Sequence, residues 1–456
     1  MTVTTLRVAI VGAGPAGIYA ADLLRKAERK FTVSVDLFEQ LPAPYGLVRY
    51  GVAPDHPRIK GIVNALREVL DGGDIHLFGN VRYGVDVTLD DLKRHYHAVI
   101  FTTGAMRDAE LEIPGVDLPG SFGASDFVSW YDGHPDVPRD WPLDDRAVAV
   151  IGNGNVALDA ARMLVKHAED LLPTEVPKNV YDRLANSPIT DVHLFGRRGP
   201  TQVKFTPLEL KELGELRDVD IILDEGDFGV DPAAELAIST NKQLFVINRI
   251  LNEWRSRETG SASRRVHLHF YSKPLEIVGT DRVEALRFER TAPDGEGGVV
   301  GTGEVRELAF DAVYRAIGFF GTPLEGIPFD LHRGVIPNRA GRAIDDDDQL
   351  VHGVYASGWI KRGPVGLIGA TKSDAMETVQ SVLNDQAEWW NPAEPSPESV
   401  AAMLRSRGIR YTDIGGWRRL DEHERALGEA EGRERVKVVP RDEMVDISLG
   451  GLSPAP

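Results

Sequence analysis

The sequence predicts an α/β protein with two Rossmann-like, three-layer dinucleotide-binding domains, the second inserted into the first. Strand signals typical of the first domain return after residue 350, which places the second domain between two parts of the first. Domain boundaries are expected at residues 1–105, 106–322 and 323–456. Two glycine-rich turns, each between an apolar strand and a helix, support this prediction: Gly12-Ala13-Gly14-Pro15-Ala16-Gly17 and Gly152-Asn153-Gly154-Asn155-Val156-Ala157.

The first part of the chain follows a strand–turn–helix–strand pattern. Residues 6–24 predict a strand, a turn and a helix, and apolar residues at helical spacing predict a second helix over Arg58–Leu70. Residues 105–145 are rich in Pro, Gly and Asp, which is typical of a connecting region. Further strands are predicted at Phe31–Glu39, Ile75–Phe78 and Ala98–Thr102.

The second nucleotide-binding unit opens at Arg146, and Leu171–Pro188 is an excursion within it. A proline-rich break at about residue 391 precedes a charged, mostly helical tail in which the sequence predicts no chemistry. The expected helices are 155–167, 206–216, 232–257 and, back in the first domain, 367–385. The expected strands are 192–195, 267–271, segments near 275–290 and 305–314, and 354–356.

The composition excludes several classes of function. The net charge of -18 disfavours nucleic acid as a partner. The cysteine count is 0, which excludes disulfides, thiolate zinc or iron–sulfur sites and a thiol relay, and no metal site is expected. The Asp345–Asp348 run lacks the ligand spacing of a calcium loop. With no apolar run of membrane-spanning length and no secretory signal, the expected location is cytoplasmic.

The first turn suits the pyrophosphate of a dinucleotide. Gly12 allows the tight bend, Gly14 lets the backbone approach phosphate, and Ala16 with Gly17 allows close helix packing. Glu39 ends the following strand, where an acidic side chain accepts hydrogen bonds from an adenosine ribose. The alternative is a surface glutamate after a strand, which the complete strand–turn–helix–strand unit disfavours.

The strand after the second turn ends in a basic pair, Arg197-Arg198, where an acidic residue would be typical of NAD(H) binding. An acid hydrogen-bonds to a free 2′-hydroxyl, whereas guanidinium groups make bidentate contacts with a 2′-phosphate. The sequence therefore predicts NADP(H) rather than NAD(H). A solvated basic turn is the alternative.

Two further segments contain candidate residues. The Gly358-Trp359 segment leads through Gly366 to a helix start, whose N–H groups favour negative charge such as that of a reduced flavin. An ordinary glycine-rich loop explains this segment equally well. His56 lies next to Pro57 and two residues after a second proline, so its backbone is restrained and it is suited to proton transfer. On spacing alone, a structural, hydrogen-bonding histidine fits better.

Five ordered motifs resemble those of the adrenodoxin reductase family of ferredoxin–NADP(+) reductases, close to the actinobacterial members that carry a C-terminal extension. They span about residues 6–385, and the most specific of them are the motifs at residues 44–57 and 358–364. Residues 312–319 depart from the family, which often has Ser before Ile/Val-Gly-Tyr. The motifs are Gly-Ala-Gly-Pro-Ala-Gly, Pro-Tyr-Gly-Leu-Val-Arg-Tyr-Gly-Val-Ala-Pro-Asp-His-Pro (44–57), Gly-Asn-Gly-Asn-Val-Ala-Leu-Asp (152–159), Gly-Arg-Arg-Gly-Pro (196–200) and Gly-Trp-Ile-Lys-Arg-Gly-Pro (358–364).

The resemblance implies that FAD binds to the first domain and NADP(H) to the second. His56 and Asp159 are implied to support proton movement near the flavin, and Glu212 to approach the nicotinamide, so these three are the implied catalytic residues. The implied FAD residues are Gly12, Gly14, Ala16, Gly17, Glu39, Leu47, Tyr83, Trp359, Gly366, Leu367 and Ile368. The implied NADP(H) residues are Asn153, Gly154, Asn155, Val156, Arg197, Arg198 and Glu209, with Gly366 near the nicotinamide.

The reaction implied by the family is that of an FAD-dependent ferredoxin–NADP(+) reductase: hydride passes from NADPH to FAD, then single electrons pass to an iron–sulfur ferredoxin. The ferredoxin is expected to dock electrostatically. A partial basic helix face could contact it or could be solvated: Arg249, Arg255, Arg257, Arg264 and Arg265. The alternatives are an NADPH-dependent flavin monooxygenase or oxidase and a non-catalytic nucleotide-sensing protein. The missing cysteines exclude a thioredoxin-reductase-like activity.

Overall fold

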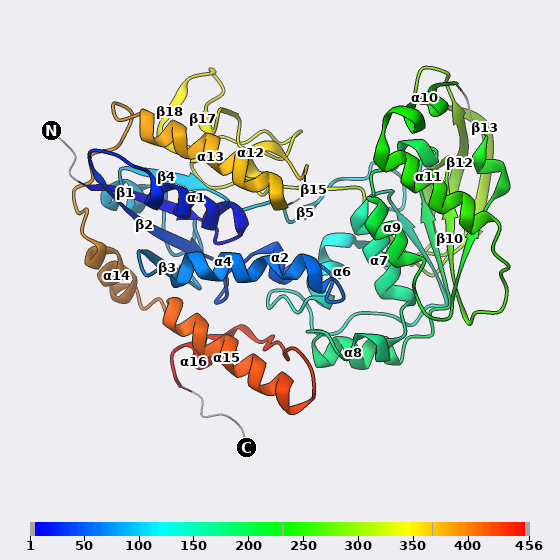
Figure 1. The fold of residues 1–456 in the computed structure, drawn as a ribbon, viewed down its shortest axis with the longest axis horizontal. Helices are drawn as coiled ribbons and strands as arrows, with labels where there is room; N and C mark the ends of the chain where they lie inside the picture. The colour runs from blue at the N-terminus through cyan, green and yellow to red at the C-terminus, as the bar shows by residue number, and fades with distance from the viewer. Residues whose placement is uncertain (1–4, 230–231, 367, 452–456) are drawn as a thin grey trace. The chain divides into compact units, whose positions relative to one another are not determined.

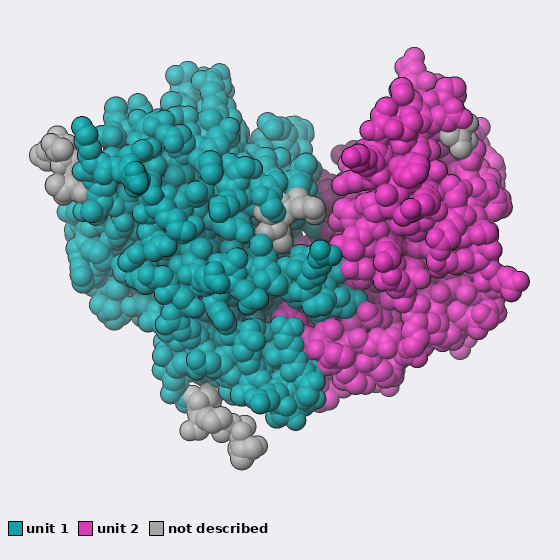
Figure 2. All heavy atoms as spheres, viewed as in Figure 1, with its two compact units in different colours: residues 1–107, 132–136, 319–456 teal, residues 108–131, 137–318 magenta. Residues whose placement is uncertain are grey.

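The computed structural model describes residues 5–229, 232–366 and 368–451, and the chain forms two compact units (Figure 2). Each unit contains a parallel sheet, and the second is inserted into the first, so the predicted fold class is confirmed. A short segment at Asp132–Asp136 returns to unit 1, which the sequence did not predict. Unit 1 comprises Met1–Arg107, Asp132–Asp136 and Phe319–Pro456, and unit 2 comprises Asp108–Tyr131 and Val137–Gly318.

Unit 1 is built on a seven-stranded sheet in the order β16-β17-β18-β4-β1-β2-β3 (Figure 1). The five strands from β18 to β3 are parallel, and β16 and β17 add an antiparallel edge. Strand β1 is buried from Leu6 to Val11 because both of its faces are covered, and its charged residue, Arg7, pairs with the buried Asp36 at 2.6 Å. The bounds are β1 Thr5–Val11, β2 Thr32–Glu39, β3 Ile75–Gly79, β4 Ala98–Phe101, β16 Asn338–Arg339, β17 Arg342–Ile344 and β18 Leu350–Ala356.

Helices cover both faces of this sheet. On one face Ile10 of β1 lies in a buried cluster with Ala20 of α1 and Val379 of α13. On the other face Phe38 of β2 is buried with Leu404 of α14. The bounds are α1 Pro15–Lys26, α2 Leu47–Tyr50, α3 Pro57–Lys60, α4 Ile62–Asp71, α5 Leu89–His95, α12 Trp359–Arg362, α13 Ile368–Asn384, α14 Pro397–Ser406, α15 Ile414–Ala430 and α16 Arg441–Ser448.

The strand register gathers three chain segments at the carboxyl edge of the unit 1 sheet. The last residue of β1 pairs with Phe38 of β2 and with Phe101 of β4. Gly12, Glu39 and Thr102 therefore lie together at this edge, because parallel strands end on the same side. Ligands of open α/β sheets bind at this edge.

Unit 2 has three layers. Its six-stranded sheet is parallel throughout, in the order β6-β14-β7-β8-β10-β9, and an antiparallel sheet of β11, β12 and β13 packs against it through Phe195, Phe288 and Phe310. The strands are β6 Ser121–Gly123, β7 Ala147–Ile151, β8 Asp191–Phe195, β9 Val219–Leu223, β10 Arg264–His269, β11 Ser272–Val278, β12 Ala285–Pro293, β13 Val299–Ala309 and β14 Ala312–Arg315. The helices are α6 Ala124–Tyr131, α7 Asn155–Val165, α8 Lys178–Ala185, α9 Pro207–Leu213, α10 Pro232–Thr240 and α11 Lys242–Arg255. A two-stranded sheet pairs β5 (Arg107–Asp108) with β15 (Phe319–Phe320).

Three details differ from the sequence-based expectations. The segment 105–145 is more than a connection, since it contains β6 and α6. The helix expected over 232–257 is two helices, because the Asn241 side chain accepts hydrogen bonds from the N–H groups of Gln243 and Leu244 and starts α11. The excursion Leu171–Pro188 contains α8.

The tail after residue 391 is an integral part of unit 1. Trp417, Leu420, Val438 and Met444 belong to the same buried cluster as the central strands. The sequence predicted a helical tail but not its burial, because an amphipathic helix does not reveal its partner. None of the helices in the described part of the chain is long and apolar enough to cross a membrane.

Candidate functional site

The first glycine turn is fixed by close backbone contacts. Gly12 has φ +113°, its N–H donates to the Phe38 carbonyl at 2.7 Å, and a Cβ on it would lie 2.6 Å from the Thr102 carbonyl oxygen. A Cβ on Gly17 would lie 2.0 Å from the Gly12 carbonyl oxygen. The Thr102 hydroxyl donates to the same Gly12 carbonyl at 2.7 Å. Only glycine fits these two positions, and Thr102 is a contributor that the glycine motif alone did not identify.

Gly14 differs from its two neighbours because the protein leaves its Cβ position open. The nearest atom to a Cβ on Gly14 is the Gly46 Cα at 3.9 Å, and φ is -76°. Gly14 is the N-cap of α1 and offers no side-chain acceptor to the first N–H groups of this helix. The turn therefore presents uncapped N–H donors and an open surface, which is the arrangement that holds a phosphate.

Glu39 lies beside this turn, at the end of β2. Its side chain is buried, and its two oxygens accept hydrogen bonds from the N–H groups of Ala13 at 2.9 Å and Leu41 at 3.0 Å. Burial raises the pKa of the Glu39 carboxyl, and these backbone donors oppose the rise. The surface-glutamate alternative is excluded, because the side chain is only 6% exposed. Each carboxylate oxygen has a second lone pair that a ribose hydroxyl could use.

The segment at residues 45–50 closes over the turn. The Tyr45 N–H donates to the Ala13 carbonyl at 2.8 Å, and Tyr45 adopts φ +84°, which is costly for a bulky residue. Leu47 follows as the first residue of α2 and is half-buried.

Tyr83 is buried against Phe101 and its hydroxyl donates to the Glu325 carbonyl at 2.7 Å. The polar tip of Tyr83 is therefore committed to the protein backbone.

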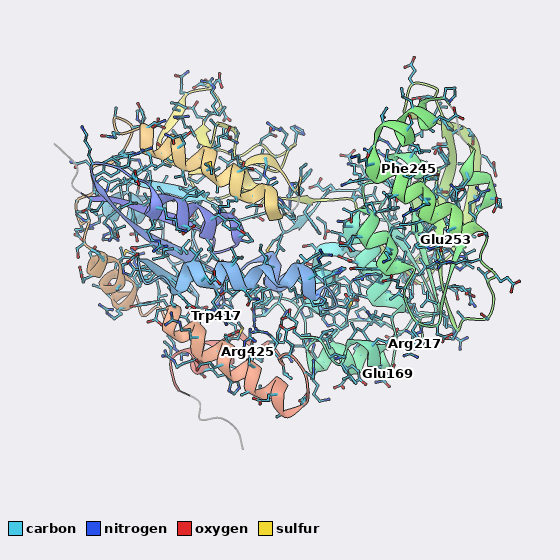
Figure 3. The ribbon with its side chains drawn as sticks, in the orientation of Figure 1. Glu169, Arg217, Phe245, Glu253, Trp417 and Arg425 are labelled. Carbon is cyan, nitrogen blue, oxygen red and sulfur yellow. The ribbon has the colours of Figure 1, made fainter. Side chains whose placement is uncertain are left out.

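The tail holds this segment in place through a network that we call the tail clamp: Tyr45, Arg49, Asp132, Trp417, Asp421, Glu424, Arg435 and Lys437. Arg49 donates to both oxygens of Glu424, at 3.0 and 2.5 Å, and the Arg435 guanidinium pairs with Glu424 at 3.0 Å. The Lys437 ammonium donates to the Arg49 carbonyl at 2.8 Å. The Trp417 ring, on α15 with Arg425 (Figure 3), packs edge-on against the Tyr45 ring. The clamp joins residues that lie far apart in the sequence, so motif analysis missed it.

The segment around Gly358 is held by α13. The Asp374 carboxylate accepts hydrogen bonds from the Gly358 N–H at 2.5 Å and the Ser357 hydroxyl at 3.1 Å, and it pairs with Lys361 at 3.0 Å. Gly358 has φ +78°, and a Cβ there would lie 2.7 Å from the Ala16 Cβ, so this segment touches the start of α1. Asp374 lies in no motif, so sequence reasoning did not predict this role.

The expected residues after this segment are only partly described. Trp359 is half-buried at the start of α12, and Gly366 is exposed with φ +88°, where glycine is favoured. Helix α13 begins at Ile368, as expected for a helix that follows a glycine-rich loop. Leu367 and the side chain of Ile368 lie outside the described residues.

The candidate catalytic residues belong to both units. His56 is in unit 1, buried at 3% exposure, and its carbonyl accepts the Lys60 N–H at 3.0 Å at the start of α3. In unit 2 the buried Arg162 side chain donates to Glu212 at 3.2 Å and pairs with Asp159 at 3.4 Å. Arg162 therefore joins α7 to α9 and fixes two candidate carboxylates. Sequence reasoning did not single out this arginine.

The second glycine turn repeats the geometry of the first. Gly152 has φ +155°, its N–H donates to the Phe195 carbonyl at 3.0 Å, and a Cβ on it would lie 2.2 Å from the Ala316 carbonyl oxygen. The nearest atom to a Cβ on Gly154, the N-cap of α7, is the Lys204 Cβ at 4.0 Å. This turn likewise leaves its second glycine open toward a ligand.

The two asparagines of this turn have different partners. The Asn155 side-chain oxygen accepts the Thr206 N–H at 2.8 Å, which ties the turn to the segment before α9. The Asn153 amide nitrogen is buried and has no hydrogen-bond partner among the described residues. Val156 is half-buried on the first turn of α7, and Glu209 is buried on α9. A buried donor without a partner fits a polar ligand at this turn.

The basic pair after β8 has a fixed backbone and exposed side chains. The Arg197 carbonyl accepts the Thr291 hydroxyl at 2.8 Å, and the Arg198 carbonyl accepts the Tyr271 N–H at 3.2 Å. Both side chains are exposed, and within the described residues neither guanidinium forms an ion pair. Both charges are therefore available for a phosphate.

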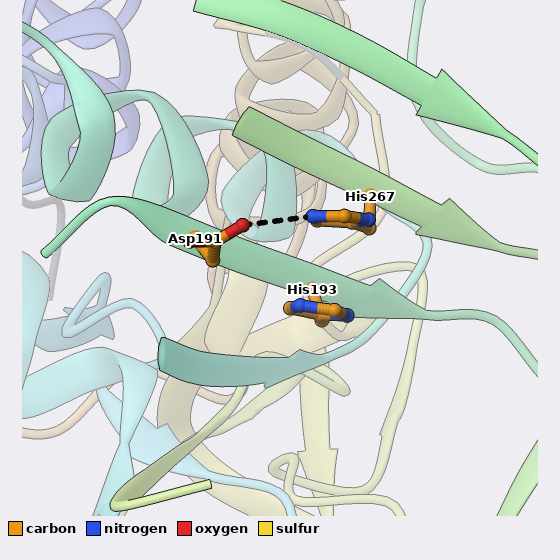
Figure 4. Close-up of side chains that lie close together, drawn as sticks. All are labelled: Asp191, His193 and His267. Carbon is orange, nitrogen blue, oxygen red and sulfur yellow. Dashed lines mark hydrogen bonds and ion pairs between the residues drawn. The ribbon is translucent and has the colours of Figure 1, made fainter. Parts of the chain in front are cut away.

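Unit 2 also contains an unpredicted cluster of ionisable side chains on β8 and β10 (Figure 4). His267 contacts the Asp191 carboxylate at 3.1 Å, and the His193 and His267 rings stack with centroids 3.9 Å apart. Arg265 occupies both oxygens of Asp191 at 2.6 and 2.7 Å, and burial lowers the pKa of His193 to about 3. The stacking of the neutral His193 and His267 rings and the bidentate ion pair between Asp191 and Arg265 explain why these side chains lie together. The Asp191 carboxylate is therefore already neutralised by a protein cation.

Comparisons with known proteins agree with the motifs. A family model described as pyridine nucleotide-disulphide oxidoreductase matches residues 6–193. The NADPH-ferredoxin reductase FprA of Mycobacterium tuberculosis is 39% identical over 97% of this chain and 99% of its own length. The human mitochondrial NADPH:adrenodoxin oxidoreductase is 37% identical, with 97% and 91% covered. The structure of M. tuberculosis FprA in complex with NADPH superposes with a TM-score of 0.90 at 39% identity, covering 98% of this chain and 100% of that chain. The chain belongs to the adrenodoxin reductase family of NADPH–ferredoxin reductases, as the resemblance predicted.

Proposed function

We propose that this chain is an FAD-dependent NADPH–ferredoxin reductase that binds FAD in unit 1 and NADPH in unit 2. One observation carries the proposal. Each unit has, at the carboxyl edge of its parallel sheet, a glycine turn whose second glycine faces no protein atom closer than 3.9 Å. One of these turns lies beside a buried acid, Glu39, and the other belongs to the unit with the exposed pair Arg197 and Arg198.

The residues of unit 1 fit FAD. Gly14 and the uncapped start of α1 suit the pyrophosphate, and Glu39 suits the adenosine ribose. When bound, FAD accepts two electrons from NADPH and releases them one at a time to an iron–sulfur protein. The proposed FAD residues are Gly12, Gly14, Ala16, Gly17, Glu39, Leu47, Tyr83, Trp359, Gly366, Leu367 and Ile368.

The residues of unit 2 fit NADPH. Gly154 and the start of α7 suit the pyrophosphate, and Arg197 with Arg198 suits the 2′-phosphate, which NADH lacks. Asn153 contributes a buried donor that has no partner within the described residues. The other proposed NADP(H) residues are Asn155, Val156 and Glu209.

His56, Asp159 and Glu212 are proposed as the residues that handle protons near the reacting rings. The His56 imidazole is restrained by burial and by its place before Pro57 at the start of α3. Arg162 restrains Asp159 and Glu212 from one side. Restrained side chains lose less entropy when they position a ligand, which favours this role over that of mobile surface groups.

The proposed electron acceptor is a small iron–sulfur ferredoxin, because the relatives are named for reductases of ferredoxin and adrenodoxin. Docking by charge complementarity predicts brief binding that weakens as salt is added. A cytoplasmic location remains the expectation from the sequence.

One assay tests the function. The purified protein is examined for flavin absorbance, mixed with NADPH or NADH, and then assayed for cytochrome c reduction with and without ferredoxin. Bleaching of the flavin by NADPH and a ferredoxin-dependent rate are expected. A colourless protein that takes up no added FAD would refute the proposal. Rapid oxygen uptake without benefit from ferredoxin would identify an oxidase or monooxygenase, and nucleotide binding without turnover would identify a sensor.

A further inference from the structure

The segment that contains Lys204 is attached to the second glycine turn through two backbone N–H groups, those of Lys204 and Thr206. The Lys204 N–H donates to the Asn153 carbonyl at 2.8 Å. Two residues later, the Thr206 N–H donates to the Asn155 side chain at 2.8 Å. These two bonds fix the position of the Lys204 Cα and Cβ relative to the turn, although the rest of the side chain can rotate.

The Lys204 side chain starts beside the open glycine. Its Cβ is the nearest atom to the position that a Cβ on Gly154 would occupy, at 4.0 Å. Gly154 is the N-cap of α7. Glycine has no side chain, so the first N–H groups of this helix receive no cap from the N-cap residue. A lysine has a flexible four-carbon stem, so its ammonium group can reach the space in front of these uncapped N–H groups.

The Lys204 ammonium group has no acidic partner among the described residues. The side chain is exposed, and it forms no hydrogen bond or ion pair with another described side chain. Lys178, in contrast, pairs with Asp182 at 2.9 Å, whereas the Lys204 ammonium group forms no ion pair with a described residue. Arg197 and Arg198, which follow the next strand, share this unpaired state.

We infer that Lys204 binds the pyrophosphate of the nicotinamide nucleotide at this turn, and that this contact is separate from the contacts of the arginine pair. The inference rests on the proposed binding of NADPH to unit 2. In a Rossmann unit the pyrophosphate lies at the second glycine and the helix start, whereas the 2′-position of the adenosine ribose lies at the end of the next strand. Lys204 borders the first place, and Arg197 with Arg198 borders the second. A lysine is a compact point charge, which suits a pyrophosphate that several N–H groups already contact.

The test compares two ligands, of which only one contains a pyrophosphate. NADP+ has the 2′-phosphate, the pyrophosphate and the nicotinamide riboside, whereas adenosine 2′-monophosphate has the 2′-phosphate and lacks the other two groups. Dissociation constants of both are measured by calorimetry on the FAD-loaded enzyme. Lys204→Ala is expected to weaken NADP+ binding about tenfold, the value of one charge-assisted contact, and to leave the binding of adenosine 2′-monophosphate unchanged. The variant should also show a smaller loss of NADP+ affinity when salt is raised.

Two variants make the comparison specific. Lys178→Ala removes the same charge from α8, where the lysine already has the carboxylate partner Asp182, and should bind NADP+ as the parent does. Arg198→Ala should weaken both ligands. Unchanged NADP+ affinity in Lys204→Ala, or an equal loss for the two ligands, would overturn the inference. An unmodified enzyme that binds neither ligand would instead overturn the proposed function itself.

Discussion

Arg49 and Glu424 form a buried, two-pronged ion pair between the segment over the first glycine turn and helix α15 of the tail. The two hydrogen bonds measure 3.0 and 2.5 Å, and the side chains are 5% and 0% exposed. The same carboxylate accepts from Arg435 at 3.0 Å and from the Val438 N–H at 3.0 Å. Glu424 is therefore the shared acceptor of the tail clamp.

Substitution Glu424→Gln should destabilise unit 1 and weaken its hold on FAD. Two guanidinium groups, of Arg49 and Arg435, would lose a buried counter-charge, which costs about 3 kcal/mol. Because Arg49 lies in the segment that closes over the turn, we also expect faster loss of FAD on dilution. Urea unfolding of the FAD-loaded protein and the flavin content after gel filtration measure the two effects.

Arg418→Gln on the same helix is the matched control. Arg418 pairs with Asp71 at 2.6 Å, but both side chains are about half exposed, so the expected loss is below about 1 kcal/mol. Equal unfolding curves for Glu424→Gln and Arg418→Gln would show that the clamp contributes no more than a surface pair.

Gly14→Ala should remove FAD binding without harming the fold. A Cβ on Gly14 meets nothing nearer than 3.9 Å in the protein, and φ of -76° suits alanine, so the cost to the fold is small. The added methyl group occupies the open face of the turn, where the backbone is expected to approach the pyrophosphate. Flavin content and the apoprotein melting temperature are measured together.

Gly17→Ala is the comparison variant for Gly14→Ala, because a Cβ on Gly17 would lie 2.0 Å from the Gly12 carbonyl oxygen and would disturb the fold itself. This variant should lose both stability and flavin. A Gly14→Ala protein that retains full FAD occupancy would remove the first turn from the flavin site.

The Arg198→Ala variant should raise the apparent Michaelis constant for NADPH by about one to two orders of magnitude, because ionic hydrogen bonds contribute about 1.5–3 kcal/mol. The constant for NADH should not change, since NADH has no 2′-phosphate. Steady-state rates with both nucleotides check this. Parallel losses for NADPH and NADH would place the arginine away from the 2′-phosphate.

The sequence predicted those features of the two glycine turns that depend on local geometry. Glycines at Gly12 and Gly152 are needed because φ is positive and a Cβ would collide, so the turn appears as a motif. Glu39 was predictable because its place at the end of β2 fixes its distance from the turn. Each of these inferences needs only a strand, a turn and a short count of residues.

The supports of the site could not be predicted, because they depend on residues far away in the chain. Asp374 reaches the Gly358 N–H from the middle of α13, and Glu424 reaches Arg49 from the tail. Charged residues on helices are usually solvated, so neither position looks special in a sequence. Lys204 belongs to the same group, since only the folded backbone places it beside Gly154.

A buried histidine in unit 1 should make stability depend on pH. His134 is 5% exposed, its Nδ1 accepts the Asp136 N–H at 3.2 Å, and its Nε2 has no hydrogen-bond partner within the described part of the chain. Burial lowers the pKa of His134 from 6.5 to about 4; Asp136 opposes this, and Arg441 and Arg82 add to it. Its ring packs against Tyr50, next to the tail clamp.

The sign of the effect follows from proton binding. Between the two pKa values the unfolded chain binds a proton at His134 and the folded chain does not, so stability is lost as pH falls below about 6.5. From pH 7.5 to pH 5 this group should lower the free energy of unfolding by about 2 kcal/mol. His134→Asn keeps an acceptor for the Asp136 N–H but cannot titrate, so its urea-unfolding free energy should fall by that much less over the same range. All other histidines are common to both proteins, and identical pH slopes would mean that His134 titrates normally in the folded state.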